Sequence, residues 1–66
     1  MIKKLYKEFI LKVVQQYGHR LRYASDELKN DKEVVLEAIQ DNGWALGYAS
    51  DELQNDHELR KLAGWK

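Results

Sequence analysis

The side chains that could act as nucleophiles or as general acids and bases occur twice in this chain. Ser25-Asp26-Glu27 recurs, in the same order, as Ser50-Asp51-Glu52. A set of residues that recurs with its neighbours is explained more simply by a repeated structural unit than by one asymmetric active site. Since serine and aspartate favour helix starts and turns, we predict that they cap helices and form turns.

Residues that could bind a metal ion lack the spacing that metal sites need. His19 and His57 occupy non-equivalent places, there is no Cys, and the two His do not form the H-E-x-x-H pair of a zinc helix. The acidic residues between positions 26 and 33 lack the alternating ligands and the glycine of a calcium loop. No glycine-rich phosphate loop is present either. We therefore expect no enzyme activity and no cofactor.

The chain is small and formally neutral. It has 66 residues, 11 basic and 11 acidic side chains, no Cys and no Pro. Residues 1–66 can form only one domain, whose core supplies about 3–5 kcal/mol at this size. Without a disulfide, that core must be efficient or shared with a partner. Its longest apolar run is three residues, against the roughly 20 needed to cross a bilayer. We expect no membrane segment and a cytoplasmic location.

An internal repeat of 25 residues organises the chain. Residues 18–31 and 43–56 are identical at ten of fourteen positions, which composition alone does not produce. Extending this match backwards gives copies at 6–30 and 31–55 and a partial third copy at 56–66. We predict a small helical-repeat bundle in which each unit covers its neighbour.

Each copy begins with a long helix. The second copy places Val34, Val35, Ala38 and Ile39 on one helical stripe. Gly18 and Gly43 follow the two helices at equivalent positions, where a left-handed glycine commonly ends a helix. We therefore predict left-handed caps at both. In the first copy the i, i+3, i+4, i+7 spacing predicts one buried stripe of Ile2, Leu5, Tyr6, Phe9, Ile10, Val13, Val14 and Tyr17.

Shorter helices follow each glycine. The apolar residues of 21–28 recur in 46–53 and predict a helix of about two turns that packs on the long one. Ser25–Leu28 and its copy Ser50–Leu53 are expected to form a further turn or a short 3₁₀ piece. These elements give an all-α fold of helix and short-helix units, about five helices in total.

The starts of the following helices leave one choice open. Asn30 with Glu33 has the spacing of a capping box, but Asp31 could cap instead, and the next copy repeats the choice at 55–58. The last copy is four residues shorter between Asp56 and Gly64 than its predecessor. Since stacked helical arrays finish with a polar terminal unit, we predict that 56–66 is a shortened cap.

The repeat also carries a resemblance. Residues 31–56 read D-K-E-V-V-L-E-A-I-Q-D-N-G-W-A-L-G-Y-A-S-D-E-L-Q-N-D, and this string resembles the repeat of a family called domain of unknown function forty-one-sixteen. Its hallmark blocks are D-x-E-V-V, N-G-x-A-L and Y-A-S-x-x-L. The first copy keeps only G-x-x-L and Y-A-S-x-x-L. The resemblance implies a tandem helical array and brings no catalytic residues.

The neutral total hides a strong charge pattern. Residues 1–22 carry a net +5, residues 23–58 a net −8, and residues 59–66 a net +3. The basic start could contact nucleic-acid phosphates through Lys3, Lys4, Lys7 and Lys12, with Arg20 and Arg22 beside aromatic residues. The adjacent acidic segment would repel a polyanion, so we disfavour this alternative.

Residues that differ between the copies are the better candidates for a specific surface. Arg20 and Arg22 stand where the second copy has Ala45 and Gly47, and Trp44 and Trp65 are the two tryptophans. Trp and Arg dominate interface hot spots, although either Trp could equally fill the core. We expect a non-catalytic module that binds a protein partner or itself, with Arg20, Arg22, Trp44 and Trp65 as candidate contacts.

Overall fold

A computed structural model describes residues 2–65 of the chain, with side chains from residue 6 onward. Every element in this part is helical, which confirms the predicted all-α class. Five are α-helices and two, η1 and η2, are 3₁₀-helices. In chain order they are α1 (Ile2–Gln16), η1 (Gly18–Tyr23), α2 (Asp26–Lys29), α3 (Lys32–Asp41), η2 (Gly43–Tyr48), α4 (Asp51–Gln54) and α5 (His57–Ala63).

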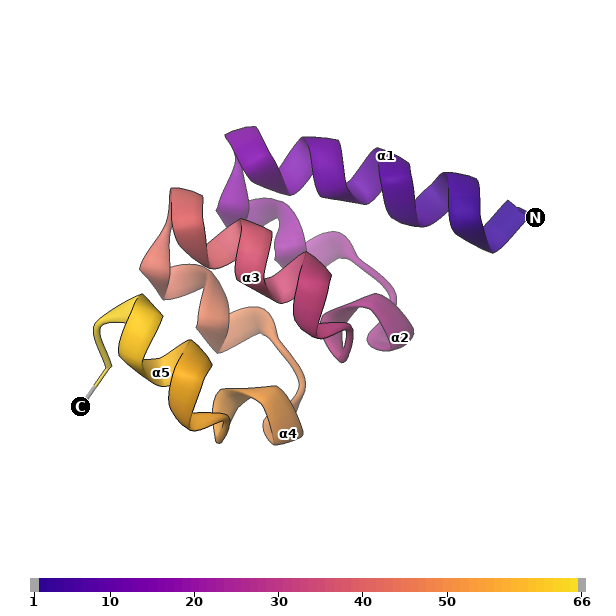
Figure 1. Cartoon of the computed structure of the whole chain (residues 1–66). Helices are drawn as coiled ribbons and strands as arrows, with labels where there is room; N and C mark the ends of the chain where they lie inside the picture. The colour runs from indigo at the N-terminus through magenta and orange to yellow at the C-terminus, as the bar shows by residue number, and fades with distance from the viewer. Residues whose placement is uncertain (1, 66) are drawn as a thin grey trace.

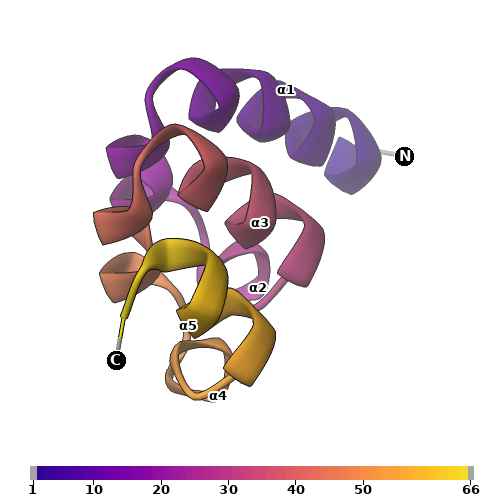
Figure 2. The same ribbon diagram turned by 60° about the vertical axis from the view of Figure 1, so that its left-hand side comes forward.

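The helices form two rows. α1, α3 and α5 run in the same direction, one below the other, from the N-terminal to the C-terminal end of the molecule (Figure 1). η1 and η2 form a second row beside them, and α2 and α4 join each η helix to the next long helix (Figure 2). α1 packs on α3, α3 on α5, and η1 on η2. Corresponding elements therefore stack on one another with the period of the sequence repeat.

Side-chain caps start the α-helices that follow each turn. The Oγ atoms of Ser25 and Ser50 accept from the backbone N–H groups of Leu28 and Leu53, as predicted. Asp31 caps α3 by accepting from the Glu33 and Val34 N–H groups, and Asp56 caps α5. These bonds resolve the open choice between asparagine and aspartate in favour of aspartate. Each satisfies an N–H group that has no partner within its helix.

The two elements after each glycine differ in type from the prediction. The predicted two-turn helix is the six-residue η1 or η2, and the serine-led segments, expected as turns or 3₁₀ pieces, are the α-helices α2 and α4 of four residues each. The serine cap accounts for this difference, because its bond to the N–H three residues on favours the first turn of an α-helix.

The left-handed caps predicted at Gly18 and Gly43 are wrong. Among the described residues, only Gly64 has a positive φ, of 81°, and it ends α5 as a left-handed cap. Gly18 and Gly43 instead begin the 3₁₀-helices. They are glycines because the backbone of the next unit lies against them: a Cβ at Gly18 would overlap the carbonyl oxygen of Ala38, and one at Gly43 would lie 2.6 Å from that of Ala63.

The core lies between the two rows of helices. It is entirely apolar among the described residues, and no buried polar side chain interrupts it. α3, which lies between α1 and α5, contributes more of its members than any other element. The side chains with no exposed surface are Val14, Leu21, Val34, Val35, Ala38, Ala45, Leu46 and Leu59.

The buried stripe predicted along α1 is only partly correct. Ile10 and Val14 are buried, but Tyr6, Phe9 and Tyr17 are 43, 61 and 51% exposed. The predicted stripe includes more residues than are buried, because α1 is covered on one side only, by α3 and η1. Ile2 and Leu5 lie outside the residues whose side chains are described. No helix in the described part of the chain combines the length and the apolar character needed to cross a bilayer.

The last unit is reduced to α5. This helix has seven residues where α3 has ten, in agreement with the shortening expected from the sequence. Leu59 is its fully buried anchor, whereas Lys61 and Leu62 are exposed. The C-terminal end of the stack is therefore narrower than the unit it covers.

Candidate functional site

Ion pairs join each unit to the next at the same place. The Lys7 ammonium lies 2.8 Å from Asp31 Oδ2 and 3.0 Å from Glu33 Oε1. One repeat later, Lys32 lies 3.2 Å from an Asp56 carboxylate oxygen and 2.8 Å from one of Glu58. The lysine thus meets the acidic first turn of the following helix, where the helix dipole also favours negative charge.

These contacts shift the pKa values of the paired groups. Hydrogen bonds to Asp31 and Glu33 raise the pKa of Lys7, and those to Glu58 and Asp56 raise that of Lys32. Partial burial acts to raise the pKa of Asp31, but hydrogen bonds from Lys7 and from backbone N–H groups outweigh it and hold that pKa below its usual value. The pKa of Asp56 is lowered by the Leu59 N–H and by Lys32.

Close backbone contact accompanies the ion pairs. The Gly18 N–H donates to Asp41 Oδ2 at 2.9 Å, across the junction between the first two units. Gly18 lies against Ala38 and the Cβ of Asn42. Together with the lysine contacts, these distances show which side of α3 receives the preceding unit: it is the side that carries Asp31, Ala38, Asp41 and Asn42.

No described unit lies on the corresponding side of α1 (Figure 1). Asp31, Val34, Ala38, Asn42 and Ala45 lie on the receiving side or next to it, and the residues 25 positions earlier form what we call the outer face. These five residues are Tyr6, Phe9 and Val13 of α1, Tyr17 between α1 and η1, and Arg20 of η1.

The change of residue type at the outer face is systematic. Val34, Ala38 and Ala45 are fully buried, whereas Phe9 is 61% exposed and Arg20 is also exposed. At all five positions the first unit has the larger side chain. These exposed aromatic groups gather on one side of the chain and differ in that from the scattered apolar exposure of most protein surfaces.

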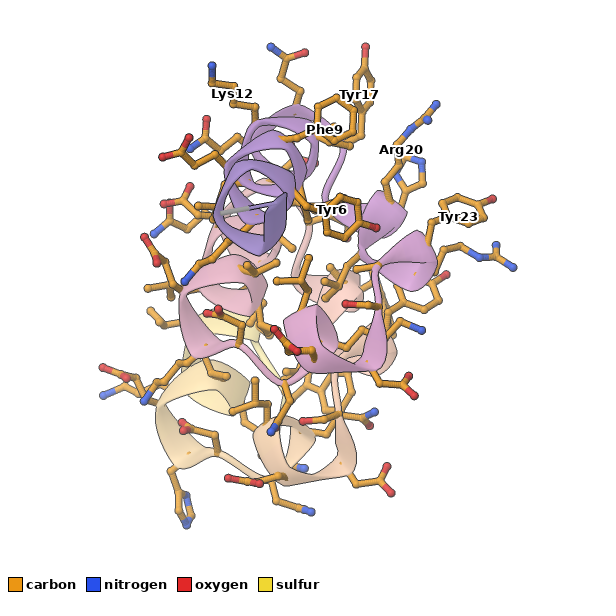
Figure 3. All side chains as sticks on the ribbon, turned by 90° about the vertical axis from the view of Figure 1, so that its right-hand side faces the viewer. Tyr6, Phe9, Lys12, Tyr17, Arg20 and Tyr23 are labelled. Atoms are coloured by element: carbon orange, nitrogen blue, oxygen red, sulfur yellow. The ribbon has the colours of Figure 1, made fainter. Side chains whose placement is uncertain are left out.

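The outer face is hollowed and basic. Figure 3 looks along α1 and shows Tyr6, Phe9 and Tyr17 projecting on the side where η1 presents Arg20 and Tyr23. A shallow hollow of about 490 Å³ is lined by Phe9, Lys12, Val13, Gln16, Tyr17 and Arg20, with no acid among them. The Arg20 guanidinium lies 5.3 Å from the centre of the Tyr17 ring, within cation–π range. The hollow thus combines apolar rings with two cations.

Arg22 belongs to a second aromatic group, which crosses the junction between units. Its guanidinium lies 5.3 Å from the ring centre of Tyr23 and 5.8 Å from that of Tyr48. Tyr23 is 70% exposed. Arg20 and Arg22 were predicted together as contact residues, but they lie over different rings, and of the two only Arg20 lines the hollow.

The two tryptophans, left undecided by the sequence, have different environments. Trp65 is half-buried and packs against the core, and Arg60 lies 5.6 Å from the centre of its ring. Trp44 is 81% exposed. Both line a small hollow at the C-terminal end of the stack. Of the pair, Trp44 is the candidate contact residue, far along the stack from the outer face.

The structure describes the side chains of two of the four lysines proposed to bind phosphate. Lys7 is held by the two carboxylates of the next unit. Lys12 is exposed and lines the hollow. The side chains of Lys3 and Lys4 lie outside the described residues. Among the described side chains, no cluster of three His, Asp or Glu residues could hold a metal ion.

Phe9 and Tyr17 are the residues that the sequence analysis assigned to the core and not to a surface. A signal was present in the repeat: the second copy has Val34 and Asn42 in their places. Two larger aromatic residues at positions that face a neighbour elsewhere in the array indicate that the neighbour differs.

Comparison with known families agrees with the repeated architecture. The family described as Domain of unknown function (DUF4116) matches residues 6–54 and again residues 31–63. The chain belongs to the DUF4116 family. The two overlapping matches start 25 residues apart, one repeat length, as expected for tandem DUF4116 units. Neither a curated protein nor a solved structure matches the chain.

Proposed function

We propose that this DUF4116 chain is a non-catalytic module that binds another protein through its outer face. The observation that carries the proposal is the contrast between Phe9, 61% exposed, and Val34, its fully buried counterpart one repeat later. The same repeat position thus holds a small side chain where a neighbouring unit buries it and a larger aromatic one where it is exposed. The larger side chain is suited to contact a partner other than a repeat unit. Burying Phe9 against such a partner would stabilise the complex by about 1.5–3 kcal/mol.

The surroundings of Phe9 support the same function. Tyr17 and Arg20 offer large contact areas with a polar end, the side-chain types that dominate protein interfaces. Elongated stacks of helical units commonly present binding surfaces, which is an analogy at the level of fold.

Capture with matched variants tests this function. Phe9→Ser/Tyr17→Ser changes two exposed side chains of the outer face, and Trp44→Ser changes the more exposed tryptophan elsewhere. Cross-linking in extracts of the cells that make the protein should recover a protein with wild type and with Trp44→Ser, but not with the double variant. Recovery that is equal for all three would place binding on another face. A chain that captures no protein and is monomeric by light scattering would end the proposal.

Nucleic-acid binding is the second candidate, favoured by the exposed Tyr17 ring beside the cations Arg20 and Lys12. Aromatic rings that stack on bases, flanked by cations, are how proteins hold single strands. The pairing of Lys7 with two acids counts against it. Binding to a single-stranded oligonucleotide that weakens steeply with salt would support this candidate, and absence of such binding at low salt would remove it.

A further inference from the structure

We propose that the outer face binds an acidic amphipathic helix of a partner protein, and that it is altered so that a unit of its own kind does not dock there. The inference rests on the proposed function and specifies the partner.

The geometry of the surface is established inside the molecule. The side of α3 that receives the first unit packs against a helix, α1. The equivalent side of α1 is the outer face, which is exposed to solvent. The aromatic and apolar residues of the outer face are spaced by three or four residues along α1 and at its end: Tyr6, Phe9, Val13 and Tyr17. They span about three helical turns, or roughly 16 Å. A helix with anchors at similar spacing is the partner shape that this face can cover.

A unit of the same kind no longer fits. At the internal junction, Gly18 approaches the backbone of Ala38 so closely that a Cβ on Gly18 would overlap it. On α1 the place of Ala38 is taken by Val13, and that of Asn42 by Tyr17. Ala38 is fully buried and the Asn42 Cβ lies at this contact, so the added atoms of Val13 and Tyr17 would cost a repeat unit docked at the same distance about 1–3 kcal/mol.

The charge of the surface has also changed sign. The receiving side of α3 carries Asp31 and Asp41, and its acids meet a lysine and a backbone N–H of the first unit. On α1 these two positions are Tyr6 and Gln16, neither of which is charged. Of the two acids that hold Lys7, Asp31 is therefore lost on α1, whereas Glu33 is retained as Glu8.

Two cations have been gained on the same surface. Lys12 and Arg20 stand in the places of Glu37 and Ala45, and both line the hollow. A partner that places carboxylates there gains charge complementarity, which favours both specificity and the rate of association.

The same charges disfavour a second copy as the occupant. Face-to-face pairing would bring two copies of Lys12 and Arg20 together. Like charges at an interface cost free energy and reject that partner. An acidic helix meets neither obstacle.

A titration followed by NMR tests the partner chemistry. The probes are a synthetic helix of about 20 residues, with leucines at i, i+3, i+4 and i+7 and glutamates on both flanks, a twin with lysines for the glutamates, and oligothymidine. We expect the glutamate peptide to shift the amide resonances of Phe9, Val13, Tyr17 and Arg20, and the lysine peptide to leave them unchanged.

Charge reversal provides the decisive variant. Lys12→Glu/Arg20→Glu should lose at least about tenfold in affinity for the glutamate peptide and should gain binding to the lysine peptide. Phe9→Ser/Tyr17→Ser should lose both, and Trp44→Ser should behave as wild type. Unchanged amide spectra away from the substitutions show that each variant is folded.

Three results would overturn the inference: equal binding of both peptides, binding of neither, or binding of oligothymidine at this face instead of a peptide. None of these three results decides whether the outer face binds a protein at all, which the capture experiment tests separately. A protein captured through Phe9 and Tyr17 that contributes a basic or non-helical segment would retain the function and reject the acidic helix.

Discussion

Gly18 lies directly against the carbonyl oxygen of Ala38, and 25 residues later Gly43 lies in the same way against Ala63. The contact joins the start of one unit's 3₁₀-helix to the backbone of the next unit's long helix. Each unit thus stacks on its neighbour at a glycine, flanked by a lysine that pairs with two acids. The absence of such a neighbour over α1 defines the outer face.

Alanine at either junction glycine should destabilise the fold. The methyl group of Gly18→Ala would overlap the Ala38 carbonyl oxygen, and that of Gly43→Ala would lie 2.6 Å from the Ala63 oxygen. Each substitution should therefore lower the free energy of unfolding by about 1–3 kcal/mol. Gly47→Ala is the matched control, because its Cβ would meet nothing closer than 3.9 Å. Urea denaturation followed by circular dichroism measures all three. Equal stability of Gly18→Ala and Gly47→Ala would contradict the stacking contact.

The left-handed glycine should behave differently from the junction glycines. Gly64→Ala meets no atom within 4 Å but keeps a φ of 81°. Its cost should therefore be the backbone strain alone, about 1–2 kcal/mol. Asparagine tolerates this conformation better than alanine, so Gly64→Asn should recover part of the loss. If alanine and asparagine prove equal at this position, backbone conformation is not what requires the glycine.

Stability should fall in acid because of the inter-unit carboxylates. The folded pKa values of Asp31 and Asp56 are lowered, so their contribution is present above the unfolded pKa near 3.9. It is lost as the pH falls through the folded values. Asp31→Asn/Asp56→Asn keeps side chains that can cap a helix but removes the charges, and should show a weaker dependence between about pH 5 and 2. An unchanged acid profile would show that these pairs do not stabilise the stack.

The lysines should have the opposite dependence. The folded pKa values of Lys7 and Lys32 are raised above 10.5, so their contribution is complete below pH 10.5 and is lost as the pH rises through the folded values. Since both pairs are largely exposed, added salt should reduce the effect. Thermal melts at pH 9 and pH 11.5, with and without salt, measure it. A stability that does not change with salt would contradict the ion-pair account.

Stability and binding should separate at the outer face. Because Phe9 and Tyr17 are mostly exposed, changing them to serine should alter the free energy of unfolding by less than about 0.5 kcal/mol each. Changing Val34, the buried counterpart of Phe9, to alanine removes core contacts and should cost about 2 kcal/mol. Denaturation of the two sets compares them. If Phe9→Ser costs as much as Val34→Ala, the outer face is part of the core.

Periodicity predicted the long helices, and residue types predicted the serine caps and narrowed the next caps to Asn or Asp, because these features depend on neighbours in sequence. The aspartate and serine caps bond to N–H groups two or three residues away, and apolar spacing alone locates α3 between them. The roles of Gly18 and Gly43 were not predictable in this way. The atoms that require glycine there belong to the next unit. A glycine that follows a helix looks the same in sequence whether it adopts a left-handed backbone conformation or packs against another part of the chain.

The exposure of the first helix depends on what covers it. The stripe along α1 has the same spacing as that along α3, so periodicity assigns both to the core. Val34 is buried because the first unit covers it, whereas no described unit lies above α1, the helix that carries Phe9 (Figure 1). The difference in exposure can be recognised in the sequence only when the two copies are compared position by position.

Radical footprinting of the complex tests the central claim most directly. Phe9, Tyr17 and Trp44 are all more than half exposed in the free chain, so each should be oxidised readily when the protein is alone. With the captured partner bound, we predict that Phe9 and Tyr17 become protected while Trp44 stays reactive. Protection of Trp44 with Phe9 and Tyr17 still reactive would show that the partner binds the other end of the stack, and would contradict the account.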